Sequence, residues 1–240
     1  MADAGAPPAK KARVDVPKSY KDLDVAAASL KVVEGKADKF YLPLFSEEVV
    51  KILLTPDGPT RLVHGFDMHG TYEQRSFNSE GAGSKRFGAE SLAIQVELDS
   101  AQVSFLQSLD ARFKELFPTD ESFEWVPLVR TSDRYAPTAK VNICLRAADE
   151  TGLTLLKFIS EGQVLSGHGW EFLKERAEAE NSGQYAFGGG EVKVVAKLRA
   201  WSMTGKDGKI RKGLSLAATQ LFIKPREKVL IQEADVLEPW

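Results

Sequence analysis

Hydrophobic and polar residues alternate along Glu191–Trp201, directly after a run of three glycines. A period of two is the pattern of a half-buried β-strand, because successive side chains point to opposite faces. A Lys-rich segment, Thr204–Lys212, and a second apolar run, Gly213–Ile223, then predict a long β-hairpin. One side of its first strand carries Val192, Val194, Ala196, Leu198 and Ala200, and the other carries Lys193, Val195, Lys197, Arg199 and Trp201.

Helical periodicity is strongest after residue 99, where Asp99 or Ser100 is a helix cap and Pro118 ends the pattern. The apolar stripe of this helix runs from Val103 to Leu116. Two shorter helices are expected, one over Ser46–Leu54 and one over Trp170–Glu180. Further strands are expected over Arg61–Met68, Ser91–Leu98, Phe123–Arg130, Thr138–Arg146 and Leu153–Ile159.

This order of elements predicts an α+β fold that is mostly β. The strands fit an OB-like five-stranded antiparallel barrel with one amphipathic helix and extra loops. A generic β-sandwich fits the pattern almost equally well. Residues 1–18 are rich in Ala, Pro and Lys and are expected to be a disordered tail, 19–228 to form one domain, and 229–240 to form a C-terminal tail.

Charge is distributed unevenly along the chain. The net charge is only −2, yet residues 185–228 hold ten Lys and Arg against three acidic residues. A cationic sheet face with an aromatic residue on it suits a single strand of nucleic acid, because phosphates attract cations and unstacked bases stack on π surfaces. The alternative is a solvated hairpin whose charges serve solubility.

The glycine-rich segment Gly70–Gly88 interleaves aromatic and basic residues, among them Lys85, Arg86 and Phe87. Such a loop fits base stacking with phosphate contact, and it fits equally well a loop whose aromatic side chains pin it to the protein. Trp201 has the same two interpretations, as a stacking platform or as a core residue.

Several functional classes are not supported by the sequence. Cys144 is the single cysteine, which excludes an internal disulfide and a Cys-based zinc cluster. His64, His69 and His168 are not spaced as metal ligands, and no phosphate-loop, dinucleotide or Gly-x-Ser-x-Gly motif occurs. We therefore expect no catalytic residues, no metal and no cofactor. No apolar run approaches a membrane span of about 20 residues, and no secretory signal is present.

The N-terminal segment contains a short basic cluster, Lys10, Lys11 and Arg13, after two prolines. It resembles a monopartite nuclear localisation signal, which predicts location in the nucleus, of a eukaryotic host cell if the protein is viral. An incidental basic tail is the alternative.

Taken together, the order of features resembles the OB-fold single-stranded DNA-binding proteins of phage and large DNA virus replication systems. The resemblance is carried by Phe187–Trp201, with its glycine run and alternating strand, and by Gly213–Ile223. A weaker match covers Phe77–Leu98 and the helix behind it, so that the resemblance spans roughly residues 61–223.

The resemblance implies a non-enzymatic protein that binds single-stranded DNA without sequence preference in replication, recombination or repair. It leaves RNA open as a ligand and a homodimer open as the oligomeric state. The alternative is a viral structural or interaction protein with a β-sandwich core. The implied binding residues are basic and aromatic: Lys193, Lys197, Arg199 and Trp201 on the strand, Lys140 and Arg146 across the sheet, Lys206, Lys209, Arg211 and Lys212 at the hairpin tip, and Arg134 and Tyr135 on a loop.

Family members often end in a long acidic tail that closes on an aromatic residue. This chain ends in a short, weakly acidic segment that closes on Trp240. The resemblance therefore implies a contact of Trp240 with replication proteins only as a hypothesis.

Overall fold

In this computed structural model the described residues are 16–34, 39–68, 91–118, 122–145, 152–160, 162–180 and 185–226. They form many short strands, two α-helices and one 3-10 turn. The helices are α2 (Ser100–Leu116) and α3 (Gly169–Ala179), and the turn is η1 (Tyr20–Asp22). The strands are β1 (Lys18–Ser19), β2 (Ala28–Glu34), β3 (Lys39–Phe45), β4 (Lys51–Leu53), β5 (Thr60–His64), β6 (Phe66–Asp67), β7 (Ser91–Glu97), β8 (Glu124–Val126), β9 (Val129–Arg130), β10 (Thr138–Cys144), β11 (Leu155–Ser160), β12 (Gln163–Gly167), β13 (Tyr185–Ala186), β14 (Glu191–Thr204) and β15 (Ile210–Lys224).

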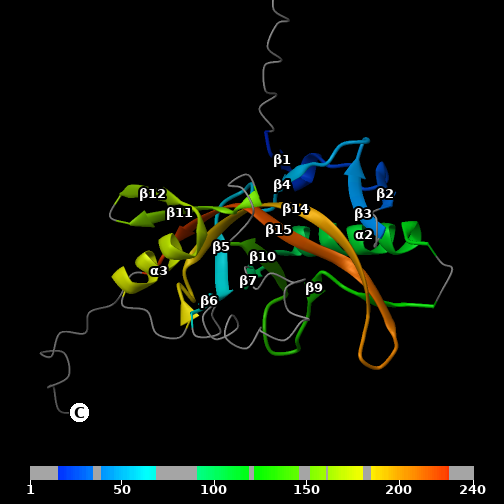
Figure 1. Cartoon of the computed structure of the whole chain (residues 1–240). Coiled ribbons are helices and arrows are strands. Elements are labelled where there is room, and N and C mark those ends of the chain that lie inside the picture. Colours follow the sequence, from blue (N-terminus) through cyan, green and yellow to red (C-terminus); the bar gives the residue numbers. More distant parts are fainter. Residues whose placement is uncertain are drawn as a thin grey trace, which may run out of the picture.

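The described strands form one 13-stranded sheet and a separate two-stranded pair of β6 and β13. Within the large sheet, the pairings β14–β5, β5–β7, β7–β10, β10–β15 and β15–β14 return to their starting strand and so form a closed ring. The remaining strands extend from this ring. Figure 1 shows the long β14–β15 ribbon running from the end of the molecule near α3 to a tip at the other end, near α2.

The run of three glycines closes this ring. The Leu62 N–H on β5 donates to Gly190 O, and the Gly189 N–H donates to Leu62 O, both at 2.7 Å. Gly189 has φ +81°, in the left-handed region that favours glycine. A Cβ on Gly190 would lie 2.7 Å from Lys224 O. A side chain at position 190 would force β14 away from β15, and position 189 needs a left-handed backbone, so these two glycines serve strand closure.

Helix α2 is positioned by the sequence signals at its start. Asp99 caps it, and the Asp99 side chain and Gln102 form a reciprocal capping box. Gln102 is itself buried and donates to Leu54 O at 2.9 Å, which ties the helix to the strands. The apolar face of α2, including Leu106 and Phe113, is fully buried in the core. Neither α-helix has the length and apolarity, in its described residues, to cross a membrane.

Several elements agree with the sequence-based expectations. The strands expected over Ser91–Leu98 and Thr138–Arg146 are β7 and β10, and the hairpin strands are β14 and β15. Helices are present after residue 99 and after Gly169 as expected. The half-buried Trp170, in the first turn of α3, packs against the core.

The helix expected over Ser46–Leu54 is wrong. Ser46 and Glu47 have φ values of +48° and +66°, which make a turn, and β4 follows. Ile52 and Leu54 are each 1% exposed and alternate with outward-facing residues. Because Val49 to Leu54 is nearly all apolar, the sequence hides this alternation. The β2–β3 hairpin and β12 were not expected either.

The sheet is mixed, not antiparallel, and α2 and α3 are two of the three helices that were expected. Strand β15 runs parallel to β8, β10 and β11. Parallel neighbours need long connections, and α3 lies in the connections that lead from β8, β10 and β11 to β15.

Candidate nucleic-acid interface

A groove of about 610 Å³ lies on the outward face of the sheet, over the middle of β14, β15 and β10. Its described lining includes three cations, several neutral polar side chains and small apolar residues, and none of it is acidic. The lining residues are Lys51, Asn142, Ile143, Cys144, Gly152, Leu153, Leu155, His168, Lys197, Arg199, Ser215, Ala217, Ala218, Thr219 and Gln220.

One wall of the groove is cationic. Lys51 on β4 is the register partner of Lys197 on β14, and Arg199 is two residues further along β14 on the same face. Leu198, between these two cations, is buried, and so are Val194 and Ala196 before them. The alternation predicted for this strand therefore directs Lys197 and Arg199 to the outward face. Lys197 and Arg199 form no ion pair with any described residue. Lys51 was missed, because its strand was expected to be a helix.

The floor and the opposite wall hold no Lys, Arg, Asp or Glu in their described part, and the Nδ1 of His168 lies 3.3 Å from Thr154 O. Across the sheet, Lys197 pairs with Ala217 on β15, and Ala217 pairs with Asn142 on β10. A bulge opposite Val195 and Ala196 places Thr219 as an extra residue in β15. The floor is therefore lined by small side chains and ends at Gln220.

Past the groove, the outward face continues to a row of one aromatic residue between two lysines. Lys193 on β14 pairs with Phe222 on β15, and Phe222 pairs with Lys157 on β11. The Lys157 Nζ lies 4.8 Å from the centre of the half-buried Phe222 ring. Lys193 was expected from the sequence, whereas Phe222 and Lys157 were not. Their alternation with buried Leu221, Ile223 and Leu156 was the available signal.

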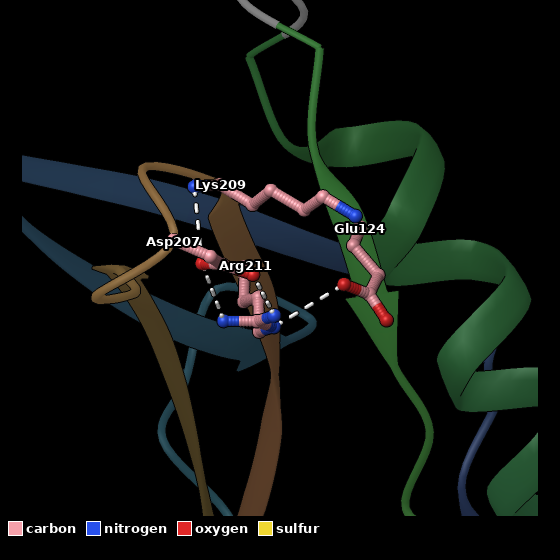
Figure 2. Close-up of polar contacts among 4 residues, drawn as sticks. All are labelled: Glu124, Asp207, Lys209 and Arg211. Atoms are coloured by element: carbon pink, nitrogen blue, oxygen red, sulfur yellow. Dashed lines mark hydrogen bonds and ion pairs between the residues drawn. The ribbon is translucent and has the colours of Figure 1, made fainter.

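At the hairpin tip the basic residues differ in their availability. Arg211 is held by two carboxylates: its guanidinium donates to both oxygens of Asp207, at 3.2 and 2.6 Å, and to Glu124 at 3.2 Å. Figure 2 shows these contacts joining the tip to β8. The hydrogen bonds from Arg211 lower the pKa of Asp207. Lys206 and Lys209 are exposed.

Lys212 was expected to contact nucleic acid, and this prediction is wrong because the residue lies in the interior. It is 6% exposed. Its Nζ donates to Pro118 O at 2.8 Å and lies 4.4 Å from the ring centre of Phe123 and 5.7 Å from that of Phe117. The reason is its register, because Lys212 shares the inward face of β15 with Leu214 and Leu216.

β8 supports the tip through Trp125, which pairs with Lys212. The buried carboxyl of Asp110 on α2 accepts from Trp125 Nε1 at 3.1 Å and from the Leu128 N–H at 2.8 Å. Burial raises the pKa of Asp110 from 3.8 to about 6, although the two hydrogen bonds counteract part of that rise. Asp110 was not a sequence-based candidate.

Trp201 is half-buried and held in place. Its Nε1 donates to Leu214 O at 3.1 Å, and a Cβ on its partner Gly213 would lie 2.9 Å from the indole. The indole therefore packs over Gly213. It is not among the groove-lining residues.

Three other candidates lie outside the groove lining. Lys140 is exposed on β10, two residues before Asn142 and on the same face. Arg134 and Tyr135 are exposed on the loop before β10, with Tyr135 75% exposed. The structure thus gathers Lys197 and Arg199 but not the complete candidate set. Eight candidates lie outside the described residues: Lys10, Lys11, Arg13, Lys85, Arg86, Phe87, Arg146 and Trp240.

Within the described part of the chain, no three His, Cys, Asp or Glu side chains gather in a way that could hold a metal ion. The groove therefore offers electrostatic and hydrogen-bonding contacts from Lys, Arg, amide and hydroxyl groups.

No protein-family model matches this sequence, and no curated protein matches it. Two solved structures show similarity to the chain. One is the single-stranded DNA-binding protein from bacteriophage Enc34, truncated at its C-terminus, with a TM-score of 0.40 and 14% identity, over 82% of this chain and 97% of that chain. The other is gp2.5, a single-stranded DNA-binding protein encoded by bacteriophage T7, with a TM-score of 0.35 and 10% identity, over 73% of this chain and 92% of that chain.

Proposed function

We propose that this protein binds single-stranded nucleic acid, with DNA as the principal ligand, in the groove over β14, β15 and β10. The observation that carries the proposal is the convergence of Lys51, Lys197 and Arg199 on one wall of a groove without an acidic residue in its described lining. In a protein of net charge −2, such a concentration of positive charge favours an anionic ligand.

The shape of the site favours a strand over a compact anion. The groove spans β4, β14, β15 and β10, and the row of Lys193, Phe222 and Lys157 extends the same face beyond it. A charged track with an aromatic side chain at one end is the arrangement that binds single strands without sequence preference. The protein is proposed to act by binding alone, without catalysis.

The ring of five strands supports an OB-type assignment, which we include in the proposal. In this ring β10 runs parallel to β15, and the other four pairings are antiparallel. OB-type barrels present oligonucleotides to one sheet face. The groove lies on the outward face of the ring strands β10, β14 and β15.

The test is a fluorescence anisotropy titration of labelled oligo-dT at two salt concentrations, with the matching duplex as competitor. We expect tight binding that weakens with salt and resists the duplex. Replacing Lys197 and Arg199 together with Ala should lower affinity and reduce the slope of log K against log salt by about 1.4, at roughly 0.7 per phosphate.

The control is a double variant, Lys31→Ala with Lys114→Ala, which removes two exposed cations from β2 and α2. It should leave the slope unchanged. Absence of binding at low salt would reject the proposed function, and an unchanged slope in the groove variant would remove the β14 wall from the site.

A protein-interaction role is the second candidate. It is favoured by an exposed apolar face on the β2–β3 hairpin, where Val33 is opposite Phe40 and next to Leu42. These side chains are 40%, 60% and 38% exposed. Exposed apolar patches of this kind often mark protein contacts. Absence of oligonucleotide binding in the same titration would favour this role.

A further inference from the structure

The two sides of the groove differ in chemistry, and this difference gives the bound strand an orientation. We propose that the sugar–phosphate backbone lies along the Lys51, Lys197 and Arg199 wall, while the bases lie over β15 and direct their edges to Asn142 on β10 and to Gln220 at the end of the β15 floor. The inference rests on the proposed function and adds which group of the ligand each side recognises.

The backbone side follows from charge. Lys51 and Lys197 are side by side across β4 and β14, and Arg199 is about 7 Å further along the strand, two residues on. Ammonium and guanidinium groups bind phosphate with charge-assisted hydrogen bonds. The opposite side has no lysine or arginine in its described lining, so phosphates have their most favourable electrostatic interactions on the β4–β14 side.

The base side follows from unused hydrogen-bonding groups. The floor hydroxyls are engaged, because Ser215 Oγ donates to Arg199 O at 3.5 Å and Thr219 Oγ1 donates to Val195 O at 3.2 Å. The half-buried side-chain amides of Asn142 and Gln220 have no hydrogen-bond partner among the described residues. An amide carries both donors and an acceptor, as the edges of bases do.

The space between the two sides fits this arrangement. Lys197 and Asn142 are separated by one strand, at Ala217, so their backbones are about 10 Å apart. Ala217 leaves the floor low between them. A nucleotide extends from phosphate to base edge over a comparable distance. Its base can therefore lie over Ala217 while its phosphate stays at the cationic wall.

The experiment uses two labelled strands of about 15 nucleotides, within the usual site sizes of such folds. One is oligo-dT, and the other is an abasic strand of the same length that keeps every phosphate but has no bases. Each is titrated against the full-length protein, against Asn142→Ala with Gln220→Ala, and against Lys197→Ala with Arg199→Ala. The remote amide variant Gln163→Ala on β12 is the matched control.

We expect the amide variant to lose about threefold to tenfold in affinity for oligo-dT, the range of one or two modest hydrogen bonds, with an unchanged salt slope. Its affinity for the abasic strand should stay the same. The cationic variant should lose affinity for both strands and have a smaller slope. Gln163→Ala should match the wild-type protein.

Equal losses for both strands in the amide variant, or no loss for oligo-dT, would overturn the orientation while leaving single-strand binding intact. If the wild-type protein binds neither strand, the proposed function fails first. Circular dichroism and a thermal melt verify that each variant is folded. If the double amide variant is not folded, Gln220→Ala alone is compared on the two strands with the same criteria.

Discussion

At the groove end of the β14–β15 ribbon, Lys197 and Arg199 form no ion pair with any described residue, whereas at the tip Arg211 is paired with Asp207 and Glu124. Lys212, next to Arg211, is buried against two aromatic rings. The tip is the more basic end in sequence, because it holds Lys206, Lys209, Arg211 and Lys212. The number of cations in a segment therefore overestimates the positive charge that is available to a ligand, because some of the cations are buried or held in ion pairs.

The largest expected effect on the protein is that of Lys212→Ala, which removes the buried lysine of the tip. The variant loses a buried hydrogen bond, two cation–π contacts and the packing of the aliphatic stem, so its free energy of unfolding should fall by about 3–4 kcal/mol. Urea unfolding measures this. Lys212→Met, which keeps the stem, should recover part of the loss. A smaller salt slope of oligo-dT binding in a folded Lys212 variant would show that this lysine contacts phosphate after all.

The support of the tip is also expected to depend on pH through Asp110. Its pKa is raised from 3.8 to about 6 in the folded protein, so between these values the folded state holds a proton that the unfolded chain has released. Stability from this group is therefore complete below pH 3.8 and is lost as the pH rises through about 6. The loss is about 2–3 kcal/mol, from 1.4 kcal/mol per pKa unit.

Urea unfolding between pH 4 and 7 tests this effect on the wild-type protein and on Asp110→Asn, which cannot titrate. The wild-type stability should decrease relative to that of Asp110→Asn as the pH rises. Glu171→Gln, at an exposed position on α3, is the matched carboxyl control and should follow the wild-type profile. Parallel profiles for the wild-type protein and Asp110→Asn would mean that Asp110 does not titrate in this range.

The smallest expected effect is that of Arg211→Ala on binding. Its guanidinium already contacts two carboxylates at the surface, where such pairs contribute little to stability. Affinity for oligo-dT should change by less than about twofold, because the two carboxylates already neutralise the guanidinium and hold it away from a phosphate. Anisotropy titrations of Arg211→Ala and of the double variant of Lys197 and Arg199, done side by side, compare the two losses of affinity directly. A loss of similar size in both would give the two ends the same role.

Local patterns predicted the parts of this fold that depend on neighbours in sequence. Alternation located β7, β10, β14 and β15, and Asp99 marked the start of α2. Alternation along β15 also places Lys212 on the same inward face as Leu214 and Leu216. The sequence-based prediction put it at the surface because lysine is usually exposed. A buried lysine needs partners from elsewhere in the chain, here Pro118 and Phe123.

The groove itself depends on contacts that no local pattern encodes. Lys51 faces Lys197 only because β4 pairs with β14, and the contiguous apolar run from Val49 to Leu54 concealed that strand. Asn142 reaches the same row through β15. Sequence reasoning found one cationic strand, and the pairing of four strands turned it into a groove.

The glycine closure has a consequence for how the protein forms. Leu62 and Gly189 are joined by two short hydrogen bonds, although most of the ring's sequence lies between them. Contacts between such distant segments cost loop entropy before they stabilise the chain, and they form slowly. During synthesis the ring cannot close until β14 has been made, and the β15 floor comes later still. The cationic wall and the floor beneath it are therefore the last surfaces of this ring to form.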